Sequence, residues 1–167
     1  ITSMVERLDD RVKDLAVELR PPSIEEFGLT STLESELEDI TNRHDVELDY
    51  TTDSIDCLLA PEDEVHLYRV IQEAITNALR HGDPDSISVD ITQMDNKISV
   101  KIRDDGSGFD TKEVMESKRS RSRLGLIGMR ERVRTISGDI NIESTPGSGT
   151  TIEITVPYNE GKQNGLN

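Results

Sequence analysis

Four short segments in which apolar and polar residues alternate most constrain the fold of this chain. In residues 87–91 and 98–102 every second residue is Ile or Val, with Ser, Asp or Lys between them, and residues 139–144 and 151–156 follow the same pattern. Strands of a parallel sheet covered on both faces would instead be apolar almost throughout. The alternation therefore predicts a two-layer α/β sandwich, with a mixed, mostly antiparallel sheet that carries helices on one face and meets water on the other.

Apolar residues at three- and four-residue steps predict the helical layer. Residues 1–20 form an amphipathic helix, and Pro21-Pro22 ends it because proline lacks an amide donor and disfavours helical geometry in the residue before it. Acidic residues just after Pro61 suit the first turn of another helix, where the helix dipole favours negative charge, and His81-Gly82 closes that helix. After the helix at 1–20, the further helices are expected at residues 27–44, 61–79 and 125–137.

The remaining segments are expected to connect these elements. Residues 46–51 alternate and predict an edge strand, and Asp95-Asn96 supplies a hairpin turn between two strands. Residues 104–124 are rich in Gly, Ser and charged residues and are typical of a long loop. The polar residues from Asn159 onward are expected to fray. No internal repeat is evident.

Composition excludes several classes of function. The chain has 34 acidic and 19 basic residues, a net charge of −15, which argues against general binding to nucleic acid or to an anionic membrane. The single Cys57 excludes an intrachain disulfide and a cysteine-based zinc site. No apolar run of about eighteen residues is present, so we expect no membrane span and no signal peptide. These features indicate a reducing, cytoplasmic setting, whether the parent protein is soluble or anchored.

The segment QEAITNALRHG contains the first candidate site. Steps of four and three residues place Glu73, Asn77 and Arg80 or His81 along one polar stripe of the helix. A carboxylate and a carboxamide four residues apart present oxygens to one point, which suits Mg²⁺ or its bound waters, and an Arg or His one turn later can meet phosphate. An ordinary solvated helix face is the alternative. Asn77 weakens that alternative, because Asn is a poor residue for the middle of a helix.

Two further segments carry glycines beside polar residues. In Asp104-Asp105-Gly106-Ser107-Gly108-Phe109 an aspartate at a strand end can accept a hydrogen bond from an amine such as adenine N6, and the glycines let backbone approach a flat ring; a plain Asp-Gly turn is the alternative. The later segment Pro146-Gly147-Ser148-Gly149-Thr150-Thr151 is by itself a turn between strands.

Gly125-Leu126-Ile127-Gly128 is expected to begin a helix directly after a loop. Amides at such a start form an anion site through their geometry and the helix dipole. The loop before it concentrates four cations, which are either a solvated charge run or a lid that meets phosphates. These are Lys118, Arg119, Arg121 and Arg123. No Walker A sequence GxxxxGK(S/T) occurs, which excludes a P-loop ATPase, and no GxGxxG follows a strand.

The order of these segments resembles the ATP-binding catalytic domain of sensor histidine kinases, a branch of the Bergerat-fold ATPases that also includes gyrase and heat-shock chaperones. QEAITNALRHG looks like the N box, RDDGSGFD the G1 box, RLGLIGMRERV the G2 box and PGSGTTIEITVP the G3 segment. The resemblance covers roughly residues 15–157. LAVELRPPSIEEFGLTSTLE looks like the second dimerisation helix and linker of the subfamily that pairs with helix-turn-helix response regulators.

The resemblance implies a role for each matching residue. Asn77 would bind the Mg²⁺ that bridges the ATP phosphates, and Glu73 would order a metal-bound or attacking water. Asp104 would bind the adenine amine. The other implied contacts to ATP come from Arg80 and His81 near the phosphates or ribose, Gly106 and Gly108 in the adenine pocket, Arg123, Gly125, Leu126 and Gly128 at the phosphates, and Thr150 on the adenine side. One departure is that Arg123 stands where the G2 box often has a glycine.

The resemblance also implies a division of the chain and a set of partners. Residues 1–22 would be part of the dimerisation domain, 23–158 the ATP-binding domain and 159–167 a flexible tail. His44, His66 and His81 do not occupy the phosphoacceptor position, so the acceptor histidine would lie outside this chain, on the first dimerisation helix. A response-regulator receiver domain would then accept the phosphoryl group. An anti-sigma-type serine kinase, a non-catalytic nucleotide-binding adaptor and, least of all, a gyrase- or chaperone-like ATPase are the alternatives.

Overall fold

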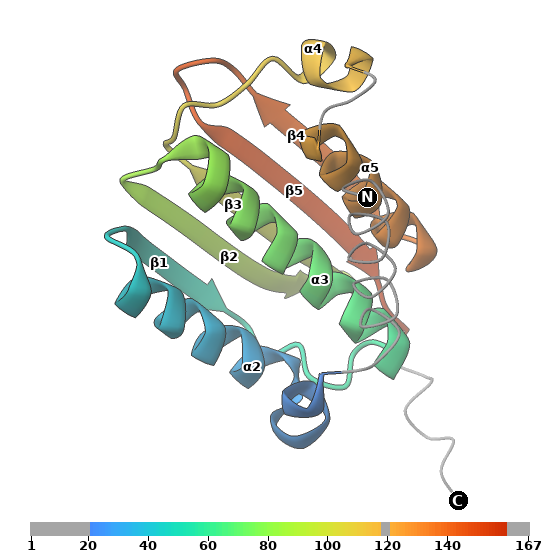
Figure 1. Ribbon diagram of the computed structural model, residues 1–167. Coiled ribbons are helices and arrows are strands. Elements are labelled where there is room, and N and C mark those ends of the chain that lie inside the picture. Colours follow the sequence, from blue (N-terminus) through green and yellow to red (C-terminus); the bar gives the residue numbers. More distant parts are fainter. Residues whose placement is uncertain (1–20, 118–120, 160–167) are drawn as a thin grey trace, which may run out of the picture.

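The computed structural model of the protein describes residues 21–117 and 121–159 (Figure 1). The predicted helix at 1–20, most of the tail, Lys118 and Arg119 lie outside the described residues, as does the side chain of Arg121. The helices are α2 (Pro22–Arg43), α3 (Pro61–Asn77), the π-helical turn η1 (Ala78–Gly82), α4 (Thr111–Glu116) and α5 (Arg121–Thr135). The strands are β1 (Glu47–Thr52), β2 (Ser86–Met94), β3 (Lys97–Asp104), β4 (Asp139–Ser144) and β5 (Thr150–Pro157).

The five strands form one mixed sheet in the order β1-β2-β3-β5-β4. β1 runs parallel to β2, and the other three pairings are antiparallel. Helices α2, α3 and α5 lie on the same face of this sheet (Figure 1). The predicted two-layer sandwich is therefore confirmed. In the described part of the chain, no helix is both long and apolar enough to cross a bilayer.

Strand alternation separates the core from the open face. Along β3 the residues are exposed and buried in turn, with Ile98, Val100 and Ile102 against the helices. On the opposite face Lys101 pairs with Glu153 of β5 at 2.8 Å, with both side chains about half exposed. A one-residue slip would move every apolar side chain into water, so this pattern fixes the register.

Helix α2 begins earlier than the sequence pattern indicates. We expected it at residue 27, but α2 starts at Pro22 and is broken at Gly28, whose φ of 83° and ψ of 169° are not helical. After this break the second part of α2 is capped by a side chain from another segment: the Asp56 carboxylate accepts a hydrogen bond from the Thr30 amide at 2.9 Å. Ile24, before the break, is buried in the core, so residues 22–27 belong to the folded unit.

The predicted β2–β3 hairpin is present with a tight turn. Asp95 and Asn96 have φ values of 53° and 59°, as both central residues of a type I′ turn require. Asn and Asp tolerate this left-handed conformation better than most residues. The turn chemistry was therefore readable from the sequence.

The predicted long loop at 104–124 is wrong in part. Residues 111–116 form α4, which begins where the Asp110 carboxylate accepts from the amides of Lys112 and Glu113. α5 begins at Arg121, four residues before the expected start at Gly125. No proline interrupts residues 121–124, and Leu126, Met129 and Val133 bury one face of the helix, which favours continuous helix through Gly125.

Candidate functional site

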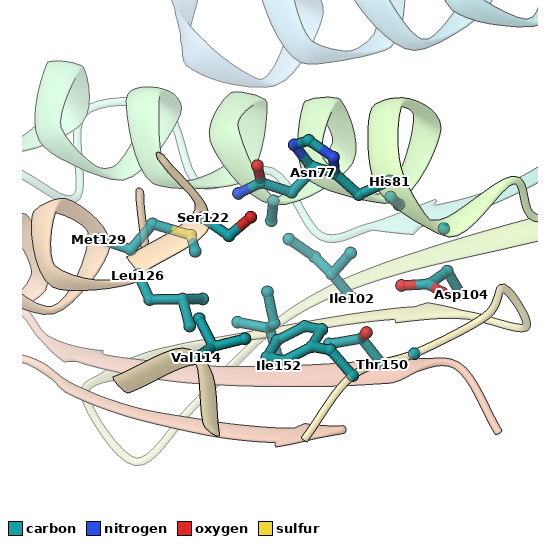
Figure 2. A pocket seen from close by; sticks show the side chains of 15 residues that line it. Asn77, His81, Ile102, Asp104, Val114, Ser122, Leu126, Met129, Thr150 and Ile152 are labelled. Carbon is teal, nitrogen blue, oxygen red and sulfur yellow. The ribbon is translucent and has the colours of Figure 1, made fainter. Parts of the chain in front are cut away.

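A cavity of about 170 Å³ lies between α3, α5 and the sheet (Figure 2). Six residues predicted for the site line it, namely Asn77, His81, Asp104, Gly108, Leu126 and Thr150. The other six predicted residues, Glu73, Arg80, Gly106, Arg123, Gly125 and Gly128, do not line it. The cavity thus joins segments from four separate parts of the chain. It has a mainly apolar wall and a few polar groups, as is common for sites that bind small molecules.

Asp104 and Thr150 form a polar end of the cavity (Figure 2). Asp104 is the last residue of β3, is only 7% exposed, and is directly opposite Thr150 on β5. Burial raises the pKa of the Asp104 carboxyl, and hydrogen bonds from the Gly106 amide and from the amide and hydroxyl of Thr150 partly offset this rise. A carboxylate in this position can accept a hydrogen bond from an amine at the edge of a flat, apolar ligand.

Glycines allow close backbone packing around Asp104. A Cβ on Gly106 would lie 2.5 Å from the carbonyl oxygen of Gly82, and the neighbouring Ser107 amide donates to that same oxygen at 2.7 Å. Gly149, at a φ of 74°, packs against the carbonyl oxygen of Asp104. The sequence predicted that Gly106 and Gly108 shape this pocket. Here Gly106 acts from outside the lining, by letting the loop approach the end of η1.

Glu73 and Asn77 meet beside the cavity on α3. The Asn77 amide donates to Glu73 Oε1 at 3.2 Å, as the predicted spacing of four residues requires. Asn77 lines the cavity, whereas Glu73 lies behind it. Together the two side chains provide the carboxylate of Glu73 and the carboxamide oxygen of Asn77 as possible metal ligands.

The π-helical turn decides which residue after Asn77 reaches the cavity. The sequence left Arg80 and His81 as equal candidates for the stripe. In the structure His81 lines the cavity, while Arg80 is exposed outside it. A π-helical turn is wider than an α-helical one, so Arg80 and His81, which lie within η1, are rotated relative to the residues of α3.

The predicted helix start at Gly125 is wrong, because Gly125 lies inside α5. The amide of a residue in that position bonds within its own helix. Instead, Gly125 lets α5 approach α3: a Cβ there would lie 2.6 Å from Glu73 Oε1. Gly128 faces only the Arg132 side chain, and Arg123 Nε is buried with no acceptor among the described residues.

Most of the lining that the sequence did not assign to the site is apolar. Ile102, Ile152 and Met129 were readable as core positions from their periodicity, but periodicity does not show which part of a core is open. Val114 could not be assigned, because α4 was expected to be loop. The further lining residues are Ala74, Ala78, Gly82, Phe109 and Ser122.

The described residues contain no group of three or more His, Cys, Asp and Glu side chains placed to hold a metal by themselves. The donor set at Glu73 and Asn77 nevertheless suits Mg²⁺. This ion usually takes one or two protein oxygens and completes its shell with water and substrate phosphates. These two residues therefore fit a magnesium ion that arrives with a phosphate ligand.

Comparison with known proteins gives a consistent result. The model of the family described as histidine kinase-, DNA gyrase B-, and HSP90-like ATPase matches residues 62–160. The chain is 32% identical to the oxygen sensor histidine kinase NreB of Staphylococcus carnosus over 160 residues. The matched region covers 96% of this chain and 45% of NreB. It is 37% identical to the histidine-protein kinase/phosphatase DegS of Bacillus subtilis over 141 residues, and this matched region covers 83% of the chain and 36% of DegS. The chain thus spans less than half of either relative.

Solved structures share the fold. The blue-light activated histidine kinase EL346 of Erythrobacter litoralis superposes with a TM-score of 0.70 at 22% identity, over 96% of this chain and 51% of that one. The ATP binding domain of PrrB from Mycobacterium tuberculosis gives a TM-score of 0.60 at 22% identity, over 79% of this chain and 95% of that one.

Proposed function

Because the chain belongs to the family of histidine kinase-, DNA gyrase B- and HSP90-like ATPases, we propose that it is the ATP-binding catalytic part of a protein histidine kinase. It would bind ATP with Mg²⁺ and donate the γ-phosphate to a histidine outside this chain. The resemblance to sensor histidine kinases read from the sequence is confirmed. The observation that supports the site itself is the buried Asp104 carboxylate at the polar end of an apolar cavity that Asn77 also lines.

The base would lie in the apolar part of the cavity. Asp104 would accept a hydrogen bond from the adenine amine, with Thr150 beside it. Ile102 and Met129 line the cavity with apolar surface that suits the faces of a purine. Gly106 and Gly108 would keep the surrounding backbone close enough to exclude water from this bond.

The phosphates would lie toward α5 and the end of α3. Asn77 and Glu73 would hold Mg²⁺, directly or through water, and the ion would supply positive charge to the phosphate oxygens. Arg123 Nε has no acceptor among the described residues, so this nitrogen is available to donate to a phosphate oxygen. Arg80, His81, Gly125, Leu126 and Gly128 are the remaining candidates for phosphate or ribose contacts.

Phosphoryl transfer would depend on positioning rather than on a covalent intermediate with this chain. An imidazole nitrogen of the acceptor histidine would form a bond to the γ-phosphorus as the bond from that phosphorus to the β–γ bridging oxygen breaks, which releases ADP. The phosphoryl group would then pass to an aspartate on a receiver domain. Cations around the γ-phosphate would stabilise the negative charge of the transition state.

The division of the chain and its partners also remain proposals. Residues 1–22 would be the second dimerisation helix and linker, 23–158 the ATP-binding domain and 159–167 a tail. The dimerisation helix that carries the acceptor histidine and a response-regulator receiver domain would be the protein partners, in the cytoplasm. We assign this chain no contact of its own with nucleic acid or membrane.

A titration of the 167-residue chain with a fluorescent ATP analogue and Mg²⁺ tests the binding proposal. We expect saturable binding that weakens about 10- to 100-fold in Asp104→Asn, since a hydrogen bond to a charged acceptor contributes about 1.5–3 kcal/mol. Asp95→Asn is the matched control, because it removes one charge at a turn position where Asn is well tolerated. No saturable binding by the wild-type chain, or equal binding by both variants, would refute the proposal.

A second experiment separates the kinase from its alternatives. Adding a peptide that carries the acceptor-histidine helix of such kinases should give phosphohistidine on the peptide. ATP binding without transfer would favour an adaptor, and transfer to a serine of a partner protein would favour an anti-sigma-type kinase.

A further inference from the structure

Ser144, Thr150 and Asp104 form a row across three neighbouring strands. Ser144 is the last residue of β4 and is opposite Thr150 on β5, which is in turn opposite Asp104 on β3. Side chains in such a row lie on the same face of a sheet and are close enough to interact. Ser144 does not line the cavity, yet it is the neighbour of Thr150 on the side away from Asp104.

The Ser144 hydroxyl contacts three residues of the two segments that meet at this end of the cavity. It accepts from the Phe109 amide at 2.9 Å and donates to the Gly149 carbonyl at 3.0 Å. It also lies 3.0 Å from the Thr150 hydroxyl, in a bond for which either oxygen can be the donor. Phe109 and Thr150 both line the cavity, so two lining segments depend on this one side chain.

Counting hydrogens shows how Ser144 acts on Asp104. Each hydroxyl has one hydrogen to donate. The hydrogen of Thr150 can go to the Asp104 carboxylate or to Ser144, and that of Ser144 can go to Gly149 or to Thr150. When Thr150 donates to Asp104, its oxygen is free to accept from Ser144. When Ser144 donates to Gly149 instead, the Thr150 hydroxyl can donate to Ser144. In both arrangements Ser144 holds the Thr150 hydroxyl beside Asp104.

The backbone around this row leaves no room for compensation. A side chain on Gly108 would overlap the Thr145 and Gly149 carbonyls, and one on Gly149 would overlap Asp104. Close packing of this kind means that a lost hydrogen bond cannot be replaced by a small movement of the loop.

We propose that Ser144 is a positioning residue for base recognition, which holds Thr150, Phe109 and Gly149 around Asp104 so that the carboxylate meets the base as an acceptor. This inference rests on the proposed function. An acceptor at this point suits the amine of adenine and repels the carbonyl oxygen that guanine carries in its place. Without Ser144 the Thr150 hydroxyl would turn freely and the Asp104 carboxylate would be held less firmly for adenine, so the pocket would discriminate less between ATP and GTP.

Binding of ATP, GTP and tripolyphosphate, each with Mg²⁺, tests the inference in the 167-residue chain. In Ser144→Ala we expect ATP to bind about tenfold more weakly, the loss of one to two hydrogen bonds, while GTP and tripolyphosphate bind as in the wild type. Ser144→Thr, which keeps the hydroxyl, should restore the preference for ATP. Ser99→Ala on the exposed face of β3 is the control and should change nothing.

The outcomes are distinguishable. Equal weakening for all three ligands would mean that Ser144 only stabilises the fold and would overturn the inference, as would unchanged ATP binding in Ser144→Ala. A wild-type chain that binds no ATP would overturn the proposed function and this inference together. If Ser144→Ala does not fold, Ser144→Cys, which keeps the size and a weak donor, carries the same expectations.

Discussion

Two glycines in the β4–β5 turn offer a matched test of how tightly the base end of the cavity is packed. Gly147 and Gly149 have φ values of 79° and 74°, so alanine at either position is forced into the same left-handed conformation. They differ in their surroundings: a Cβ on Gly147 meets nothing within 4 Å, whereas one on Gly149 would overlap the backbone of Asp104. The difference between the two alanine variants therefore isolates that overlap.

The expected magnitudes follow from these contacts. The left-handed conformation costs an alanine about 1–2 kcal/mol, which is the whole effect expected for Gly147→Ala. Gly149→Ala adds an overlap with backbone atoms that cannot rotate away, and overpacking of this kind typically costs about 1–3 kcal/mol more. Because urea lowers stability by about 1–3 kcal/mol per molar, the two unfolding midpoints should differ by roughly 1 M.

Urea unfolding followed by circular dichroism measures the difference, and an ATP titration of the same samples measures its effect on the site. We expect Gly149→Ala to bind ATP more weakly, because the overlap displaces Asp104, and Gly147→Ala to bind as the wild type does. Equal midpoints for the two variants would refute the packing described around Asp104. A lower midpoint for Gly149→Ala with unchanged ATP affinity would separate packing from base recognition.

Three other changes have defined outcomes. Burial raises the pKa of the Asp104 carboxyl above its ordinary value, so its ionisation costs the wild type stability as the pH rises above that value. Asp104→Asn does not titrate and should gain stability relative to the wild type over the same rise, and a gain that shrinks with rising pH in urea titrations would contradict this. Met129→Ala should lose about 2–5 kcal/mol in the same assay, because the side chain is fully buried, and an unchanged midpoint would contradict its place in the core. Lys101→Ala, which breaks an exposed ion pair with Glu153, should leave the midpoint unchanged, and a large shift would show that the open face is not solvated as described.

The sequence predicted best what depends on short-range pattern. The strand faces follow from alternation, the hairpin turn from Asp95-Asn96, and the meeting of Glu73 with Asn77 from helical spacing. The position of Asp104 at a cavity end also follows from local order, since it ends a strand and precedes two glycines. Each of these features is set by residues within a few positions of one another.

The features that the sequence did not predict depend on contacts between distant segments. Gly125 lies inside α5 and lets that helix approach Glu73 on α3, a contact between distant segments that the local sequence pattern does not show. Nor did the sequence show that η1 is π-helical, with His81 at the cavity and Arg80 outside it. For α4 a local signal did exist: Asp110 with Glu113 three residues later is a helix-start pattern within the Gly- and Ser-rich segment.

The parallel pairing of β1 with β2 has a consequence for how chains of this kind can vary in length. Helix α3 lies in the crossover connection between β1 and β2. The residues proposed to hold magnesium are therefore on a segment whose two ends are both fixed by neighbouring strands of the sheet. The segment from β3 to β4 is different: those strands are separated by β5, and no ladder depends on the distance between them. Insertions should therefore be common in the connection from β3 to β4 and rare in the crossover from β1 to β2. A reporter peptide inserted near Glu116 should leave all four strand pairings intact.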